Sequence, residues 1–144
     1  MTMYAEEVGN YWRTSRTSPD KWIEKAKNEI ARVGGLILAE GFGNEPQTGR
    51  AAYMLAFELG EDRFKMIWPV LQSKTGHGGA ARIQAATALY REVKAACVKA
   101  KFLGTRAAFF AYWLLPDGRA ASEVSAPELL EALPKMLTSP PIDD

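Results

Sequence analysis

The sequence has very few of the residues that carry metal and nucleophilic chemistry. It contains one cysteine, Cys97, and one histidine, His77, in 144 residues. A single cysteine excludes an internal disulfide, and a histidine with no neighbouring cysteine or second histidine does not provide the ligand set of a zinc site. The acidic residues are not spaced as an acid and base pair, and no Ser/His/Asp arrangement is evident. We therefore expect no metal, no cofactor and no enzymatic activity.

Long apolar runs are also lacking. The longest strongly apolar run, residues 107–115, is far shorter than the roughly 20 residues that a membrane-spanning helix needs, and the chain does not open with a secretory signal pattern. We expect a cytoplasmic protein. With 144 residues, of which 47% are hydrophobic and 24% are charged, the chain has the size and composition of one domain with its own core.

A nucleotide-binding loop is missing too, although residues 71–79, LQSKTGHGG, are rich in glycine and lead into a predicted helix. Glycines and a lysine ahead of a helix can bind phosphate through backbone amides and the helix dipole. The segment does not fit the pattern G-x-x-x-x-G-K-[ST], so we expect no ATP site. A mobile connection and a simpler anion site are both compatible with this composition.

Acidic residues are scarce in the middle of the chain, although the net charge is only +1. From Arg63 to Arg106 there are nine lysines or arginines and a single acid, Glu92, whereas from Asp117 onward six acids face two basic residues. A positive region in a neutral protein is typical of a surface that binds a polyanion. The alternative is that the acidic C-terminal region folds back and neutralises it.

The pattern of apolar residues predicts an α+β fold that begins with a helix and a sheet. Ser18-Pro19-Asp20 has the cap, proline and acid of a helix start, and the helix should end at Gly34-Gly35. Three strands follow, at 36–42, 51–59 and 63–69, where apolar and polar residues alternate in the second and third. Since a short turn joins these two, we expect a three-stranded antiparallel meander.

A long central helix, residues 80–104, organises the second half of the chain. Its apolar residues recur every three or four positions and should form the core face: Ile83, Ala86, Tyr90, Val93, Cys97 and Ala100. Arg91, Lys94 and Lys101 fall in one sector on the opposite side, with Lys99 on its flank. On this pattern Cys97 is a buried thiol with no chemical role.

The ends of the chain complete the predicted layout. Residues 105–112 fit a helix or a strand, Pro116-Asp117-Gly118 predicts a turn within a short hairpin or a strand and loop over 113–123, and Ser125 starts a C-terminal helix. The predicted organisation is a flexible arm over 1–17, a single domain over 18–138 and a tail over 139–144. Aromatic residues in the arm, Tyr11 and Trp12, lie near arginines and could stack on bases; poor order or docking on the domain is the alternative.

Several short segments resemble a family of small proteins of unassigned role from phages and mobile elements. Members of that family have a basic helix followed by a segment of the type FLAHIVLPDGR. The matching segments here are Arg82 and Gln84, Ala88-Leu89, Val93-Lys94-Ala95, Phe110-Ala111-Tyr112 and Leu115-Pro116-Asp117-Gly118-Arg119. The resemblance brings no activity with it. The order of three antiparallel strands and a long helix is also similar to the core of phage single-strand annealing proteins, which is an analogy of fold.

Charge and resemblance together lead to the hypothesis of a non-enzymatic nucleic-acid-binding protein of phage type. It would bind single-stranded DNA or anneal it in recombination, as an oligomer if it follows the annealing proteins. The candidate contact residues are Arg82, Arg91, Lys94, Lys99, Lys101, Lys65 and Lys74, with Tyr11 and Trp12 for stacking. The alternative is a protein-interaction or self-assembly module without a nucleic-acid role, in which aromatic residues such as Phe109, Phe110 and Trp113 are exposed rather than core.

Overall fold

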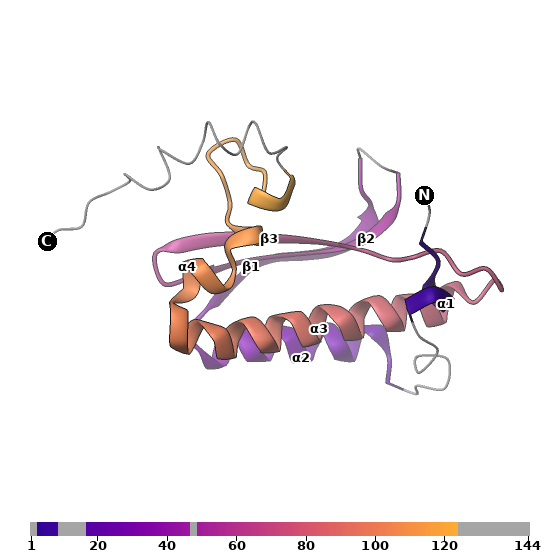
Figure 1. The fold of residues 1–144 in the computed structure, drawn as a ribbon, viewed down its shortest axis with the longest axis horizontal. Helices are drawn as coiled ribbons and strands as arrows, with labels where there is room; N and C mark the ends of the chain where they lie inside the picture. Colours follow the sequence, from indigo (N-terminus) through magenta and orange to yellow (C-terminus); the bar gives the residue numbers. More distant parts are fainter. Residues whose placement is uncertain (1–2, 9–16, 47–48, 124–144) are drawn as a thin grey trace, which may run out of the picture.

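The computed structural model describes residues 3–8, 17–46 and 49–123. In these ranges, a three-stranded antiparallel sheet of order β1-β2-β3 has two long helices, α2 and α3, on one face (Figure 1). The α+β class, the first helix, the meander and the long central helix are therefore confirmed. The predicted C-terminal helix and tail, and the arm residues Tyr11 and Trp12, lie outside the described residues.

Helix α2, Pro19–Arg32, starts and stops where its sequence predicts. The Ser18 hydroxyl accepts a hydrogen bond of 3.3 Å from the backbone N–H of Lys21, and proline occupies the first turn. At the other end, a Cβ on Gly35 would lie 2.5 Å from the side chain of Ile30 and 3.2 Å from the carbonyl oxygen of Glu58. Only glycine allows the chain to pass so closely between helix and sheet.

The sheet consists of β1 (Leu36–Asn44), β2 (Ala51–Leu59) and β3 (Asp62–Pro69). Strand β1 is two residues longer than predicted. Phe57 of β2 pairs with Phe64 of β3, and Gly60 forms the turn between them with φ of +66°. Alternation along β2 buries one face of the strand, which consists of Tyr53, Leu55, Phe57 and Leu59.

Helix α3, Gly78–Leu103, runs parallel to α2 beside it (Figure 1). The rings of Trp22 and Tyr90 are 5.3 Å apart, and seven residues further along both helices the Cys97 thiol lies 3.7 Å from the carbonyl oxygen of Glu29. The buried face of α3 is broader than the predicted stripe. It includes the polar residue Gln84, whose amide donates a hydrogen bond of 2.8 Å to the carbonyl of Ala5.

After α3 the chain crosses from the helix side of the sheet to its other side (Figure 1). Residues 105–112, which fitted a helix or a strand, are helical: α4 spans Thr105–Ala108 and the 3-10 turn η2 spans Phe110–Tyr112. A second 3-10 turn, η3, spans Ala121–Glu123. Phe109 is fully buried, with its ring 5.3 Å from Phe57 and 5.5 Å from Phe64. Phe109 and Trp113 therefore belong to the core and are not an exposed interface.

The predicted turn at Pro116-Asp117-Gly118 is present and is stabilised by its own side chains. The backbone N–H of Leu115 donates to the carbonyl of Arg119 at 2.7 Å, and Gly118 has φ of +89°. The Asp117 carboxylate accepts from the guanidinium and the backbone N–H of Arg119, at 2.8 and 3.0 Å, which lowers the pKa of Asp117. The charged side chains of this turn, Asp117 and Arg119, therefore form an ion pair with each other.

The first described residues differ from the free arm that the sequence predicts. Tyr4 forms a parallel bridge with Gln72, and Ala5, the first residue of the short helix α1 (Ala5–Val8), is fully buried. The arm prediction is corrected for residues 3–8, which pack on the loop before α3. The reason is complementary polarity, since the 73–75 loop presents donors and Glu6 presents a carboxylate.

Candidate nucleic-acid interface

The nine lysines and arginines from Arg63 to Arg106 do not share one surface. Lys65 lies on the sheet face opposite the helices, where its ammonium is 3.1 Å from the carboxylate of Glu123 and donates to the carbonyl of Gly118 at 2.9 Å. Lys74 pairs with Glu7 at 3.6 Å, near the first residues of the chain. The structure thus separates both lysines from Lys94, Lys99 and Lys101 in the second half of α3, with which sequence reasoning grouped them.

Arg82 is on α3, but it packs inward against the sheet. Its guanidinium lies 4.1 Å from the ring centre of Phe42, and its Nε donates a hydrogen bond of 3.3 Å to the hydroxyl of Tyr53. A planar guanidinium that stacks on an aromatic ring stabilises a contact between elements. Arg82 therefore connects α3 to β1 and β2.

Lys94, Lys99 and Lys101 are exposed on the second half of α3. Within the described part of the chain, none of the three forms an ion pair with a carboxylate. Arg91 is exposed on the same half of the helix. This is the part of the predicted basic face that the structure leaves open to solvent.

A fourth lysine, Lys25 of α2, joins this region through two aromatic rings. Its ammonium lies 4.4 Å from the ring centre of Trp22, the Trp22 and Tyr90 rings are 5.3 Å apart, and the ammonium of Lys94 lies 5.9 Å from the Tyr90 ring centre. Lys25, Lys94, Lys99 and Lys101 are called the lysine surface below. Sequence reasoning missed Lys25 because it treated α2 as purely structural; the i, i+3 spacing of Trp22 and Lys25 was the available signal.

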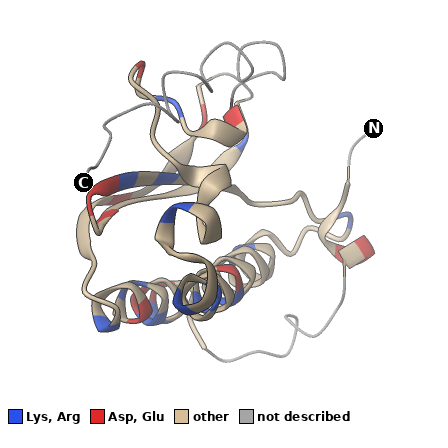
Figure 2. Cartoon of the chain, turned by 60° about the vertical axis from the view of Figure 1, so that its left-hand side comes forward, with Lys and Arg blue, Asp and Glu red and all other residues tan. Residues whose placement is uncertain are grey.

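Acidic residues of α2 occur close by, but they are paired on their own helix. Glu24 lies 3.2 Å from Lys27, and Glu29 lies 3.0 Å from Arg32. Lys27 also contacts Glu40 of β1, and these carboxylates raise the pKa of Lys27. Figure 2 shows the result, with basic and acidic segments on both helices rather than a uniformly basic layer. The lysine surface lies beside these ion pairs, and its four lysines take no part in them.

The same end of α3 also exposes apolar side chains. Phe102 is 82% exposed, Leu103 61% and Val98 51%. Val98 and Phe102 are one turn apart and therefore lie on the same side of the helix. Because the helix advances about 100° per residue, Lys99 and Lys101 lie on opposite sides of Phe102. An exposed aromatic ring thus stands between two lysines.

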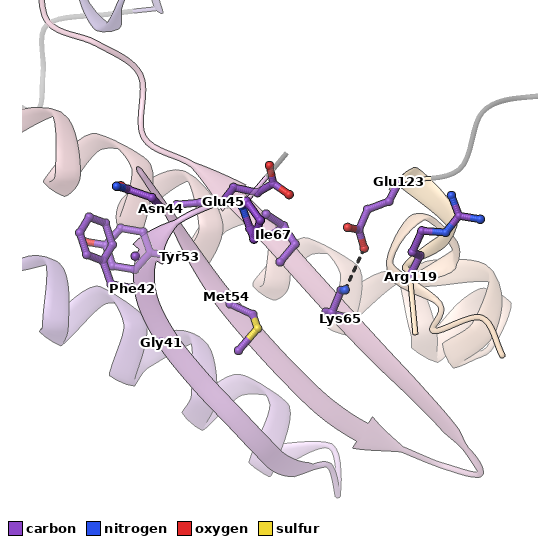
Figure 3. A pocket seen from close by; sticks show the side chains of 13 residues that line it. Gly41, Phe42, Asn44, Glu45, Tyr53, Met54, Lys65, Ile67, Arg119 and Glu123 are labelled. Atoms are coloured by element: carbon purple, nitrogen blue, oxygen red, sulfur yellow. Dashed lines mark ion pairs between the residues drawn. The ribbon is translucent and has the colours of Figure 1, made fainter. Parts of the chain in front are cut away.

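A cavity of about 520 Å³ opens on the sheet face away from the helices (Figure 3). Met54 and Ile67 contribute apolar surface, and the charged residues at its rim include the Lys65–Glu123 ion pair and Arg119. Arg119 is engaged by Asp117. In the described ranges, no three His, Cys, Asp or Glu side chains gather into a set that could hold a metal ion. The cavity offers an apolar surface rather than a reactive group.

The glycine-rich loop before α3 already holds an anionic group from the chain itself. The Glu6 carboxylate accepts hydrogen bonds from the Ser73 hydroxyl at 2.6 Å, the Lys74 backbone N–H at 2.9 Å and the Thr75 hydroxyl at 2.9 Å. These hydrogen bonds, with Ser73 contributing most, lower the pKa of Glu6 well below its ordinary value. The donors that an external anion would use are therefore occupied by Glu6.

The fold and this surface define an α+β domain with an open cluster of lysines and an exposed aromatic residue. No protein-family model, curated protein or solved structure matches the chain. In the described part of the chain, no helix is both long and apolar enough to cross a membrane.

Proposed function

We propose that the protein binds nucleic acid without enzymatic chemistry, and that single-stranded DNA is its preferred ligand. The observation that supports this proposal is the exposure of Lys94, Lys99 and Lys101 on one half of α3 with no carboxylate partner in the described residues. Lysine ammoniums spaced along a helix can contact successive phosphates of a polynucleotide. Lys25 extends the surface onto α2.

The proposed contact residues differ from those grouped by sequence. Lys65 and Lys74 are left out because their ammoniums already face Glu123 and Glu7. Arg82 is left out because it packs on Phe42. The lysine surface remains, and Arg91 is exposed on the same half of α3. Any role of Tyr11 and Trp12 stays a prediction, since these residues lie outside the described ranges.

The affinity of such a surface should depend strongly on salt. Each lysine that neutralises a phosphate releases a condensed counterion, so the logarithm of the binding constant falls linearly with the logarithm of salt concentration. Fluorescence anisotropy with labelled oligothymidine at two salt concentrations measures this slope. Lys99→Ala should weaken binding and lower the slope by about one. Absence of binding by micromolar wild-type protein at low salt would contradict the proposal.

Arg63→Ala is the matched control for Lys99→Ala. Arg63 is 63% exposed and contacts Glu58 at 3.4 Å on β2, so its replacement removes one positive charge away from the lysine surface. If both variants lose the same affinity, the effect comes from net charge and not from a localised site. Retention of wild-type affinity by Arg63→Ala, with a loss in Lys99→Ala, supports contact at α3.

A role in annealing is the finer part of this proposal. It draws on the order β1, β2, β3, α3, which resembles the core of phage single-strand annealing proteins and is an analogy at the level of the fold. The test is whether the protein accelerates pairing of two complementary labelled strands at a concentration that saturates binding. An unchanged pairing rate would leave simple binding and remove annealing.

A protein-interaction module is the second candidate, because Val98, Phe102 and Leu103 are exposed together. Light scattering over a range of protein concentrations distinguishes the two. A self-assembly module should increase in mass with concentration in the absence of DNA, and Phe102→Ala should reverse that increase. A monomer that binds oligonucleotide supports the first candidate.

A further inference from the structure

Phe102 is the most exposed of the large hydrophobic side chains in the described part of the chain, at 82%. Two aromatic residues that follow α3 lie in the core instead: Phe109, seven residues later, is fully buried, and Trp113 is 9% exposed. Phe102 occupies the last turn of α3, immediately before Leu103 and the cap residue Gly104. The fold therefore holds this ring on a helix, outside the core.

The surroundings of Phe102 are cationic on both sides. Lys99 precedes it by three residues and Lys101 by one, so the two ammoniums leave the helix on opposite sides of the ring. Neither lysine has a carboxylate partner in the described ranges. A flat apolar surface between two positive charges is complementary to a chain in which apolar faces alternate with negative charges.

From this arrangement we infer that Phe102 stacks on an unpaired base while Lys99 and Lys101 contact the flanking phosphates, and that this contact makes the protein selective for single strands. The inference rests on the proposed nucleic-acid binding and specifies the ligand. In a duplex, base faces are covered by their neighbours, so that only the lysines can make contact. In a single strand, an aromatic ring adds a stacking contact that tolerates any base sequence.

Charge also argues against a second copy of the chain as the occupant of this patch. A two-fold contact centred on Phe102 would bring Lys99 and Lys101 of one copy against the same residues of the other. Like charges that meet in an apolar contact oppose association. The observed pattern fits an anionic ligand better than self-association.

The test compares Phe102→Ala with wild type on labelled oligothymidine and on a duplex of the same length. Phe102→Ala should weaken single-strand binding by about tenfold, since stacking on one base contributes on the order of 1–3 kcal/mol. Duplex binding should change less than about twofold, and the salt slope should stay the same because no cation is lost. Phe102→Tyr, which keeps an aromatic ring, should retain the preference.

The binding results for wild type and Phe102→Ala distinguish failure of the stacking inference from failure of the proposed nucleic-acid binding on which it rests. If wild type binds neither oligonucleotide, the proposed function falls. If wild type binds but Phe102→Ala weakens single strands and duplex equally, or neither, the stacking inference is overturned and lysine-mediated binding stands. Loss of binding that accompanies a loss of mass in light scattering would also overturn it, because the patch would then join copies of the chain.

Discussion

The backbone N–H of Lys74 donates a hydrogen bond of 2.9 Å to Oε1 of Glu6, which lies 68 residues earlier in the chain. The Ser73 hydroxyl donates to the other carboxylate oxygen at 2.6 Å. These hydrogen bonds to the Glu6 carboxylate connect the first described residues to the glycine-rich loop ahead of α3. The loop is therefore ordered by a residue that its own sequence does not contain.

Glu6→Gln should release this loop at neutral pH. A neutral amide accepts weaker hydrogen bonds than a carboxylate, so backbone amides in 73–77 should lose protection in hydrogen exchange. Glu7→Gln is the control, because Glu7 contacts Lys74 only through the ammonium, at 3.6 Å. Equal loss of protection in both variants would show that the loop responds to net charge rather than to the Glu6 carboxylate.

Acid should reproduce the effect of this substitution in wild type. The pKa of Glu6 in the fold is below its ordinary value of 4.5, so its contribution to stability is complete above that value and is lost as the pH falls through the lower folded pKa. Loop protection, corrected for intrinsic exchange rates, should decrease below about pH 4 in wild type. It should decrease less in Glu6→Gln, and an identical acid response in both proteins would refute this assignment.

The ion pair between Asp62 and Arg106 should contribute more than other surface pairs. The guanidinium makes two hydrogen bonds to the carboxylate, of 2.8 and 3.2 Å, and Asp62 is only 15% exposed. Asp62→Asn should lower the free energy of unfolding by about 1 kcal/mol, measured by urea denaturation. Glu58→Gln, which breaks the single 3.4 Å contact to Arg63, should change it by less than about 0.5 kcal/mol.

Two phenylalanines seven residues apart should respond in opposite ways to truncation. Phe109 is fully buried among aromatic rings, so Phe109→Ala should cost about 3–5 kcal/mol of stability. Phe102→Ala should stay within about 0.5 kcal/mol of wild type, because its ring is 82% exposed. Thermal and urea unfolding measure both. A large loss in Phe102→Ala would mean that this ring packs against protein.

Cys97 should react slowly while the protein is folded. Burial, and secondarily the nearby carboxylate of Glu29, raises the pKa of the Cys97 thiol to about 11, and the side chain is 3% exposed. At about pH 8, iodoacetamide should therefore label the native protein far more slowly than the urea-unfolded protein, since the thiolate is the nucleophile. Equal labelling rates in the two states would place Cys97 at an accessible position.

The sequence predicted the elements well because their signals are local. The cap at Ser18, the glycines after α2 and the alternation along β2 each act through neighbouring residues, and the structure confirms them. The breadth of the buried face of α3 was not predictable in this way. Gln84 is buried because the carbonyl of Ala5 meets it, and a helical pattern contains no information on that partner.

The candidate site was predicted less completely, because nearness in sequence was taken as nearness in space. Strand alternation already implied that Lys65 points away from Phe64 and Met66, which face the helices, so its separation from α3 could have been anticipated. For Lys25, the i, i+3 spacing indicated only its contact with Trp22, and its nearness to the lysines of α3 could not have been anticipated because it depends on the parallel placement of α2 beside α3.

The two edge strands of the sheet, β1 and β3, differ in what lies beside them. Strand β3 has Trp113 bridged to Phe64, and the chain passes around it from one face to the other. Strand β1 pairs with β2 alone within the described residues, and nearly all of its side chains are exposed. The outer backbone edge of β1 is therefore the place where, in concentrated solution, a strand of a second molecule would first pair with the sheet.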